Sequence, residues 1–354
     1  MVTLSRKEYF AEKIVFVDGL PGCGKTLFST IISAMDKVEL LSYSYEVEHI
    51  CQLFFLDKIQ LDAATTMIGI QTDLKLYNTM MGRDVNFRAS DLSSAVNYHN
   101  PSKYFDRLND IGDSAIPEKI IQEKPILNIS VHNMLAFSDP IWKSLGNRCV
   151  FIEIVRHPLY MIRQQALNMQ NMIATARSFS VYFEKHNHEL IYYAKGWEDK
   201  YLQSNSLERV IYFMDNLTNK TKKARDRLTL EFKPNILTIP FEQFVLDSDL
   251  WVDKIAEIIG TKITDATKEE LKKQNIPRDM VAQGIDLDIY RRCGWVPPKN
   301  NSTERDELNV RREDVAKEVG SDALAVLDRL SRDYENQYWN PDIKSCNSIK
   351  IHAH

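Results

Sequence analysis

The sequence predicts an α/β fold, with a central, mostly parallel sheet flanked by helices. Residues 14–17 are four consecutive apolar residues, three of them β-branched, which is typical of a strand buried on both faces. Similar runs occur at 126–131, 149–155 and 235–239. Segments with helical apolar spacing alternate with these runs, beginning with residues 27–35. Strands that alternate with helices favour parallel pairing.

Length and composition indicate one large globular domain over residues 1–354. The apolar fraction is 44% and the charged fraction 27%, with a net charge of −4 and a pI of about 6.1, which argues against a general nucleic-acid binder. The five cysteines form no CxxC pair or Cys/His cluster, so neither a structural zinc site nor a disulfide framework is expected. The charged N-terminus and the lack of a long apolar run predict a cytoplasmic protein without a membrane span.

The first strand leads into a glycine-rich loop that predicts phosphate binding. Residues 19–26 read Gly-x4-Gly-Lys-Thr and lie between the strand at 14–18 and the helix at 27–35. Glycines let backbone N–H groups converge on one anion, and the helix N-terminus adds partial positive charge. Lys25 supplies a mobile cation and Thr26 a hydroxyl. We therefore expect a phosphorylated nucleotide to bind the loop residues Gly22, Cys23, Gly24, Lys25, Thr26 and Leu27.

Two further strands end in residues suited to chemistry on such a nucleotide. The strand at 126–133 carries His132 at its carboxyl end, where open parallel sheets bind their ligands. Histidine suits proton transfer near neutral pH. The strand at 149–155 ends in Arg156, just before a helix, and a planar guanidinium there is placed to hold a phosphate.

Taken together, these motifs resemble the sulfotransferases that use 3′-phosphoadenosine 5′-phosphosulfate (PAPS). The likeness lies in the N-terminal strand, loop and helix, a strand that ends in His132, and a strand that ends in Arg-x-Pro at Arg156. The C-terminal third is also similar to the family. It contains a strand with a Glu-x-Phe segment at 235–247 and an amphipathic helix that ends in glycine at 251–260. A basic loop with tryptophan follows at 291–295, and a last helix at 323–336.

The resemblance implies a mechanism for these residues. Gly24, Lys25 and Thr26 would hold the 5′-phosphosulfate, and Arg156 would hold the 3′-phosphate. His132 would deprotonate the acceptor hydroxyl or amine. The products would be the sulfated acceptor and adenosine 3′,5′-bisphosphate, without a metal ion.

The resemblance also implies a closing loop, and the sequence departs from the family at two positions. Arg291, Arg292 and Trp295, within a loop at 284–300, would bracket the adenosine and close over the nucleotide. The family places its catalytic lysine directly after the loop proline, where this chain has Gly22. It places a serine eight residues after the strand-end arginine, where this chain has Gln164, whose amide can still donate hydrogen bonds to a phosphate.

Two alternatives stay open. The intact Gly-x4-Gly-Lys-Thr loop is also that of a kinase that transfers phosphate from ATP with Mg²⁺, with Thr26 on the metal and Asp18 or Glu153 assisting it. A non-catalytic nucleotide-binding regulator would use the loop but would not need His132. Magnesium dependence separates the kinase from the sulfotransferase.

The middle of the chain predicts a helical insertion on the acceptor side, over residues 165–230. We expect helices at 179–194 and 207–219, with His186 and His188 on the surface. The aromatic run at 192–198 is either a stacking platform for a flat acceptor or part of the packing between helices. A small-molecule or carbohydrate acceptor is expected, but neither its identity nor the oligomeric state is specified by the sequence.

Overall fold

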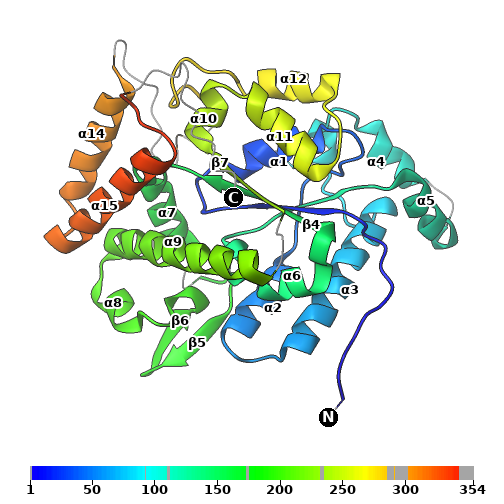
Figure 1. Ribbon diagram of the computed structural model, residues 1–354, viewed down its shortest axis with the longest axis horizontal. Coiled ribbons are helices and arrows are strands. Elements are labelled where there is room, and N and C mark those ends of the chain that lie inside the picture. Colours follow the sequence, from blue (N-terminus) through cyan, green and yellow to red (C-terminus); the bar gives the residue numbers. More distant parts are fainter. Residues whose placement is uncertain are drawn as a thin grey trace.

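The computed structural model describes residues 2–91, 93–109, 112–172, 175–231, 235–284, 291 and 302–342. Its centre is a parallel sheet of five strands in the order β2-β3-β1-β4-β7 (Figure 1). The strands are β1 (Ile14–Asp18), β2 (Ser42–Tyr43), β3 (Leu127–Ser130), β4 (Cys149–Val155) and β7 (Ile236–Pro240). The predicted α/β class and the strands expected at 14–18, 126–133, 149–155 and 235–239 are confirmed.

Both faces of the sheet are covered, which explains the unbroken apolar runs. In β1, Val15 and Val17 belong to one hydrophobic cluster, whereas Ile14 and Phe16 belong to the other. Successive side chains of a strand point to opposite faces, so a strand between two helical layers must be apolar throughout. Phe16 stacks on Phe151 of the adjacent strand, with 5.1 Å between ring centroids.

Helices form the two outer layers. In Figure 1, α1, α10, α11 and α12 lie above the sheet, and α2, α3, α6 and α9 lie below it. The helices on the first side are α1 (Lys25–Ser33), α10 (Phe241–Leu246), α11 (Asp249–Ile259) and α12 (Asp265–Lys273). Those on the second side are α2 (Tyr45–Phe55), α3 (Leu61–Met80), α6 (Asp139–Leu145) and α9 (Ser206–Glu231). The remaining helices are α4 (Ser102–Arg107), α5 (Ile116–Glu123), α7 (Pro158–Met172), α8 (Glu198–Gln203), α14 (Glu304–Ala316) and α15 (Ser321–Gln337).

One helical prediction is wrong. Residues 179–194 contain an antiparallel hairpin instead of a helix, formed by β5 (Tyr182–Lys185) and β6 (His188–Ile191). The helix expected at 207–219 is present within α9, so the predicted insertion is only partly helical.

The hairpin is stabilised by a two-residue turn. His186 and Asn187 both have positive φ, 52° and 61°, and connect the paired residues Lys185 and His188. A turn with two left-handed residues matches the twist of the two strands. His186 and His188 are exposed, as predicted. Among the described helices, none is long and apolar enough to cross a bilayer.

Candidate functional site

A cavity of about 260 Å³ opens at the carboxyl edge of the sheet, and each strand contributes to it. Because all five strands are parallel and in register, their carboxyl ends meet at this edge. From β2 to β7 in spatial order, these ends contribute Tyr43, Ser130 with His132, the loop after β1, Arg156 and Phe241. The full lining is Pro21, Gly22, Gly24, Lys25, Thr26, Leu27, Tyr43, Ser130, His132, Arg156, Tyr160, Arg163, Gln164, Phe241, Arg278, Val281, Ala282, Gly284 and Arg311.

The loop after β1 needs glycine for steric reasons. Gly24 precedes α1 with φ 105°, and a Cβ there would lie 2.5 Å from the Phe241 ring. Gly19 has φ 143°, and a Cβ there would lie 2.5 Å from the carbonyl oxygen of Ile154. The loop therefore packs directly against β4 and α10. Without a side chain at Gly24, nothing caps the first turn of α1, and that turn contains no acidic residue.

Lys25 folds back over this loop. Its side chain is largely buried, and Nζ donates to the carbonyl oxygens of Gly19 at 2.7 Å and Leu20 at 3.3 Å. Both acceptors are neutral carbonyl oxygens, and Lys25 lines the cavity. Cys23, also expected to contact ligand, is buried and does not line the cavity, whereas Leu27 does.

Two partly buried arginines line the same cavity. Arg156 Nη1 donates to the Gly22 carbonyl oxygen at 2.8 Å, and its guanidinium lies 4.1 Å from the Phe241 ring centroid. Arg311, from α14, lies 4.8 Å from the Tyr160 ring centroid. Among the described residues, the Nε atoms of both arginines are buried without a hydrogen-bond partner. Burial lowers the pKa of Arg311, and the charge of Arg156 lowers it further, whereas Tyr160 and two nearby carboxylates oppose the shift in part. An anion at this end of the cavity would satisfy both side chains.

Sequence reasoning missed Arg311. It follows a polar stretch of α14 and is adjacent to an exposed arginine, so the pattern resembles a solvated helix face.

Gln164, which was predicted, is present on α7 beside the loop. A Cβ on Gly22 would lie 3.0 Å from Gln164 Oε1, so the amide packs directly against the glycine.

His132, which also lines the cavity, is oriented by a buried carboxylate. Glu48 Oε1 lies 2.9 Å from His132 Nδ1 and accepts the His132 backbone N–H at 3.1 Å. Because a carboxylate only accepts hydrogen bonds, Nδ1 carries a proton, and in the neutral imidazole the free lone pair is then on Nε2. Glu48 is 5% exposed and was not predicted. The sequence feature that could have identified Glu48 is its position as an acidic residue between Val47 and Ile50, on the buried side of α2.

A second buried carboxylate connects the end of β1 to the loop after β3. Asp18, 1% exposed, accepts the backbone N–H groups of Met134 at 3.0 Å and Leu135 at 2.6 Å. Burial raises its pKa to about 6, against the opposing effects of these hydrogen bonds and of Lys25. Glu153 accepts from Thr238 Oγ1 at 2.7 Å and forms an ion pair with Arg225. Both carboxylates considered for a kinase metal site therefore have structural partners.

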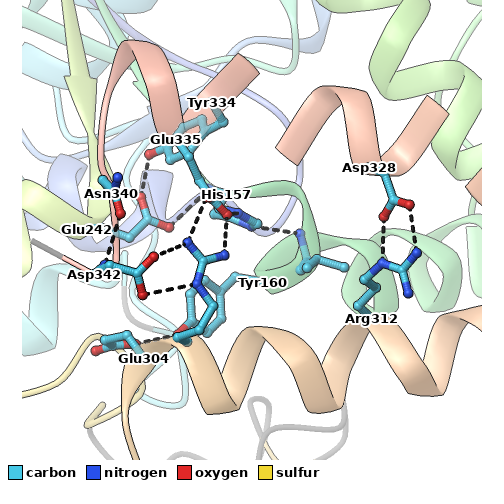
Figure 2. Close-up of polar contacts among 12 residues, drawn as sticks. His157, Tyr160, Glu242, Glu304, Arg312, Asp328, Tyr334, Glu335, Asn340 and Asp342 are labelled. Atoms are coloured by element: carbon cyan, nitrogen blue, oxygen red, sulfur yellow. Dashed lines mark hydrogen bonds and ion pairs between the residues drawn. The ribbon is translucent and has the colours of Figure 1, made fainter. Parts of the chain in front are cut away.

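The residue after Arg156 anchors the strand end to the C-terminal helices (Figure 2). The buried His157 donates its backbone N–H to Glu242 at 3.0 Å, and its Nδ1 accepts the Leu159 N–H at 3.3 Å. Its Nε2 lies 3.3 Å from Glu335, which also accepts two hydrogen bonds from Arg305, at 3.0 and 2.8 Å. Burial tends to raise the pKa of Glu335, but these hydrogen bonds lower it to about 2. The network holds Arg156 next to α14 and α15.

The predicted closing loop lies almost entirely outside the described residues. Arg292, Trp295 and most of 284–300 are not described. Arg291 is exposed and does not belong to the described lining of the cavity, whereas Gly284 does.

The aromatic run at 192–198 does not form a platform, because Tyr192 and Tyr193 are buried. The alternative, packing between helices, is confirmed for these two residues.

No protein-family model and no curated protein sequence matches the chain. Among solved structures, a sulfotransferase domain of the Synechococcus olefin synthase aligns with 94% of this chain and 98% of its own, at 11% identity and a TM-score of 0.43. A sulfotransferase domain from the curacin biosynthetic pathway aligns with 90% of this chain and 97% of its own, at 10% identity and a TM-score of 0.43. The sulfotransferase STF9 of Mycobacterium avium aligns with 94% and 78%, at 12% identity and a TM-score of 0.42. The chain is similar to these sulfotransferases in the path of its backbone, and its function is inferred below from the residues of the cavity.

Proposed function

We propose that this protein is a sulfotransferase that moves a sulfuryl group from PAPS to an acceptor hydroxyl or amine. The observation that carries the proposal is that one cavity joins an anion-binding end to a carboxylate-oriented imidazole. The loop after β1, Arg156 and Arg311 line the cavity together with His132, which Glu48 orients from outside the lining.

The anion-binding end fits a donor with phosphate groups at both ends of its ribose. The buried, unpartnered Nε atoms of Arg156 and Arg311 suit the 3′-phosphate, because each guanidinium has donors left for an anion. Lys25, the first turn of α1 and the amide of Gln164 suit the 5′-phosphosulfate. This extends the motif-based assignment of Arg156 with a second arginine from α14.

His132 would accept the acceptor proton. Glu48 fixes the tautomer in which Nε2 is unprotonated, and it stabilises the imidazolium that forms when Nε2 takes the proton. PAPS supplies the sulfuryl group. As the acceptor oxygen or nitrogen bonds to sulfur, the bond between sulfur and the bridging oxygen breaks, and adenosine 3′,5′-bisphosphate leaves.

Lys25 and the backbone N–H groups of the loop would stabilise the negative charge that develops on that bridging oxygen. Electrostatic stabilisation by donors already in place is usually the largest contribution to such catalysis. Two carbonyl oxygens hold the Lys25 ammonium beside the loop, and from there it would need to move only a short distance to the bridging oxygen.

Two measurements test the proposal: one identifies the nucleotide that binds, and the other detects transfer of the sulfuryl group. We expect calorimetry to detect adenosine 3′,5′-bisphosphate binding that EDTA leaves unchanged, and weaker binding of ADP, with or without Mg²⁺. Transfer of ³⁵S from labelled PAPS to a panel of acceptors measures the chemistry, and Lys25→Ala should lower turnover on the order of 10²-fold or more. Tight binding of ATP that depends strictly on Mg²⁺ would instead favour the kinase. Nucleotide binding unaffected by His132→Ala, with no transfer to any acceptor, would favour the regulator.

A further inference from the structure

A second groove lies between the end of α2 and the C-terminal half of α9, two helices on the same side of the sheet (Figure 1). It has a volume of about 220 Å³ and shares no described lining residue with the cavity at the sheet edge. It is called the α2–α9 groove below. Its apolar lining comes from α2, the loop after β3 and α9, and consists of Phe54, Phe55, Ala136, Phe137 and Ala224.

The apolar lining is anchored in the core. Phe137 and Ala224 are buried, and the rings of Phe55 and Phe137 are tilted against each other with 4.7 Å between their centroids. Phe54 and Phe55 are half-buried, so part of their surface faces the groove and solvent. Covering that surface with another apolar group is favourable. The groove can therefore bind the apolar part of a ligand without a rearrangement of its walls.

The polar residues of the lining give the groove a positive charge. They are Lys220, Lys223, Arg227 and Asp139. Arg227 and Asp139 neutralise each other, because Arg227 Nη2 donates to both carboxylate oxygens, at 2.6 and 2.7 Å. The Lys220 ammonium donates to Asn216 Oδ1 at 2.7 Å and to a backbone carbonyl oxygen at 3.3 Å, and both acceptors are neutral. Among the described residues, no carboxylate forms an ion pair with Lys220 or Lys223, so two positive charges are left for a ligand.

A third lysine lies close to these two. The Nζ atoms of Lys195 and Lys220 are each 5.1 Å from the centroid of the Phe55 ring, and an exposed aspartate pairs with Lys195 at 2.6 Å. Burial lowers the pKa of Lys220, and the charges of Lys195 and Lys223 lower it further, whereas Glu198 opposes the shift. Like charges beside an apolar wall repel one another in the free protein. An anion in the groove would relieve this repulsion.

The size and charge of the groove restrict its ligand. At about 220 Å³ it is smaller than the roughly 300 to 1,000 Å³ of pockets for drug-sized molecules, so it suits a single ring system. An inorganic anion would leave the aromatic wall uncovered, and an uncharged ring would leave the lysines without a partner. A nucleic acid binds through a longer series of free cations than the two present here.

We propose that the α2–α9 groove is a binding site for a small organic anion with one sulfate, sulfonate or carboxylate group on a ring-sized apolar body. The body covers Phe54 and Phe55, and the anionic group contacts Lys220 and Lys223. This site is separate from the cavity with His132, and it does not rest on the proposed sulfuryl transfer.

The test measures binding of naphthalene-2-sulfonate by calorimetry. Naphthalene-2-sulfonamide has the same ring without the charge, and methanesulfonate has the same charge without the ring, so both should bind at least tenfold more weakly. Lys223→Met keeps the length of an exposed side chain and should weaken naphthalene-2-sulfonate binding on the order of tenfold, the size expected for loss of one charge-assisted contact. Lys222→Met is the matched control, because Lys222 is the adjacent exposed lysine and does not line the groove.

A second variant locates the bound anion. The arginines of the cavity at the sheet edge are another place where a sulfonate could bind, and Arg311→Met weakens that site. Binding in the α2–α9 groove should be unchanged in Arg311→Met and weakened in Lys223→Met. Thermal unfolding of each variant shows whether it is folded at the temperature of the titration.

Four results would overturn the proposal. The first is equal affinity for the sulfonate and the sulfonamide, which would mean that the charge is not recognised. The second is equal affinity for naphthalene-2-sulfonate and methanesulfonate, which would mean that the apolar wall is not used. The third is an equal loss in Lys222→Met and Lys223→Met, the result of net charge alone. The fourth is binding that Arg311→Met weakens and Lys223→Met does not, which would place the anion in the other cavity.

Discussion

Replacing Arg311 with methionine should change stability and nucleotide binding in opposite directions. The Arg311 side chain is 19% exposed, and its nearest carboxylate, Glu307, is 4.0 Å away. Its Nε has no partner among the described residues, and Arg156 faces the same cavity. On the proposed function, such a side chain is held in place for a ligand at a cost to the free protein.

The magnitude follows from these contacts. Removing a buried, poorly paired charge and keeping a side chain of similar length should stabilise the free protein by about 1 kcal/mol. Methionine can retain the contact with the Tyr160 ring, because sulfur also packs well against aromatic rings. For a domain of this size the midpoint of thermal unfolding should rise by about 2 °C. Loss of charge-assisted hydrogen bonds to a phosphate, about 1.5 to 3 kcal/mol, should weaken nucleotide binding roughly 10- to 150-fold.

The neighbouring residue provides the control. Arg312 is one position later on α14, 42% exposed, and its two hydrogen bonds to Asp328 are both 2.7 Å (Figure 2). Arg312→Met should lower stability by at most about 1 kcal/mol and leave nucleotide affinity unchanged. Thermal unfolding measures the first quantity, and calorimetry with adenosine 3′,5′-bisphosphate measures the second.

Two results would refute the reasoning. If Arg311→Met unfolds at a lower temperature than the wild type, its charge is compensated in the free protein and the site is not an unfilled anion site. If the affinity of Arg311→Met and Arg312→Met falls equally, the effect is one of net charge and not of a direct contact.

Three further predictions concern other parts of the structure. Glu48→Gln should lower turnover about 10- to 100-fold and shift the pH profile without changing nucleotide affinity, because an amide orients His132 but does not stabilise its charged form; an unchanged pH profile would argue against the dyad. Glu39→Gln should destabilise the fold by about 3 kcal/mol in urea titrations, because Arg107, which contacts Glu39 at 2.8 and 3.0 Å, loses its buried partner. Gly24→Ala should abolish nucleotide binding, since its Cβ would overlap the Phe241 ring; retained binding would show that the loop can rearrange.

The Glu39 prediction also has a pH dependence. Burial tends to raise the pKa of Glu39, but hydrogen bonds and charges from Arg107 and Lys103 outweigh it and lower the pKa from 4.5 to about 2. Stability from this group is therefore fully present above about pH 4.5 and is lost as the pH falls towards 2. In Glu39→Gln this acid-dependent loss should be smaller. An identical acid unfolding curve in both proteins would contradict the assignment.

The sequence predicts the parts of the site that depend on local order. The strand at 14–18, the glycine-rich loop and the polar residues at the ends of β3 and β4 each follow from a short pattern. The position of the strand ends at one edge follows from parallel pairing. For these parts, residues far away in sequence do not change the interpretation.

The parts that were missed depend on what packs against them. Glu48 and Arg311 are charged residues on helices, and their burial is decided by β3 and α7 rather than by their neighbours in the chain. The hairpin at 182–191 was predicted as a helix because its only turn signal is one asparagine, Asn187, next to a histidine. The strand β6 buries two adjacent residues, Leu190 and Ile191. Over only four residues, such a pattern does not distinguish a helix from a strand.

The network of His157, Glu335 and Arg305 has a consequence for synthesis on the ribosome. The glycine-rich loop emerges early, at residues 19–26, but the helices that complete its surroundings with Arg311 and Glu335 emerge near residue 335. A nascent chain can therefore pair β1, β3 and β4 while Arg156 still lacks its anchor. On the proposed function, the protein should acquire its full affinity for anions only after α14 and α15 have emerged, when its central sheet has already formed.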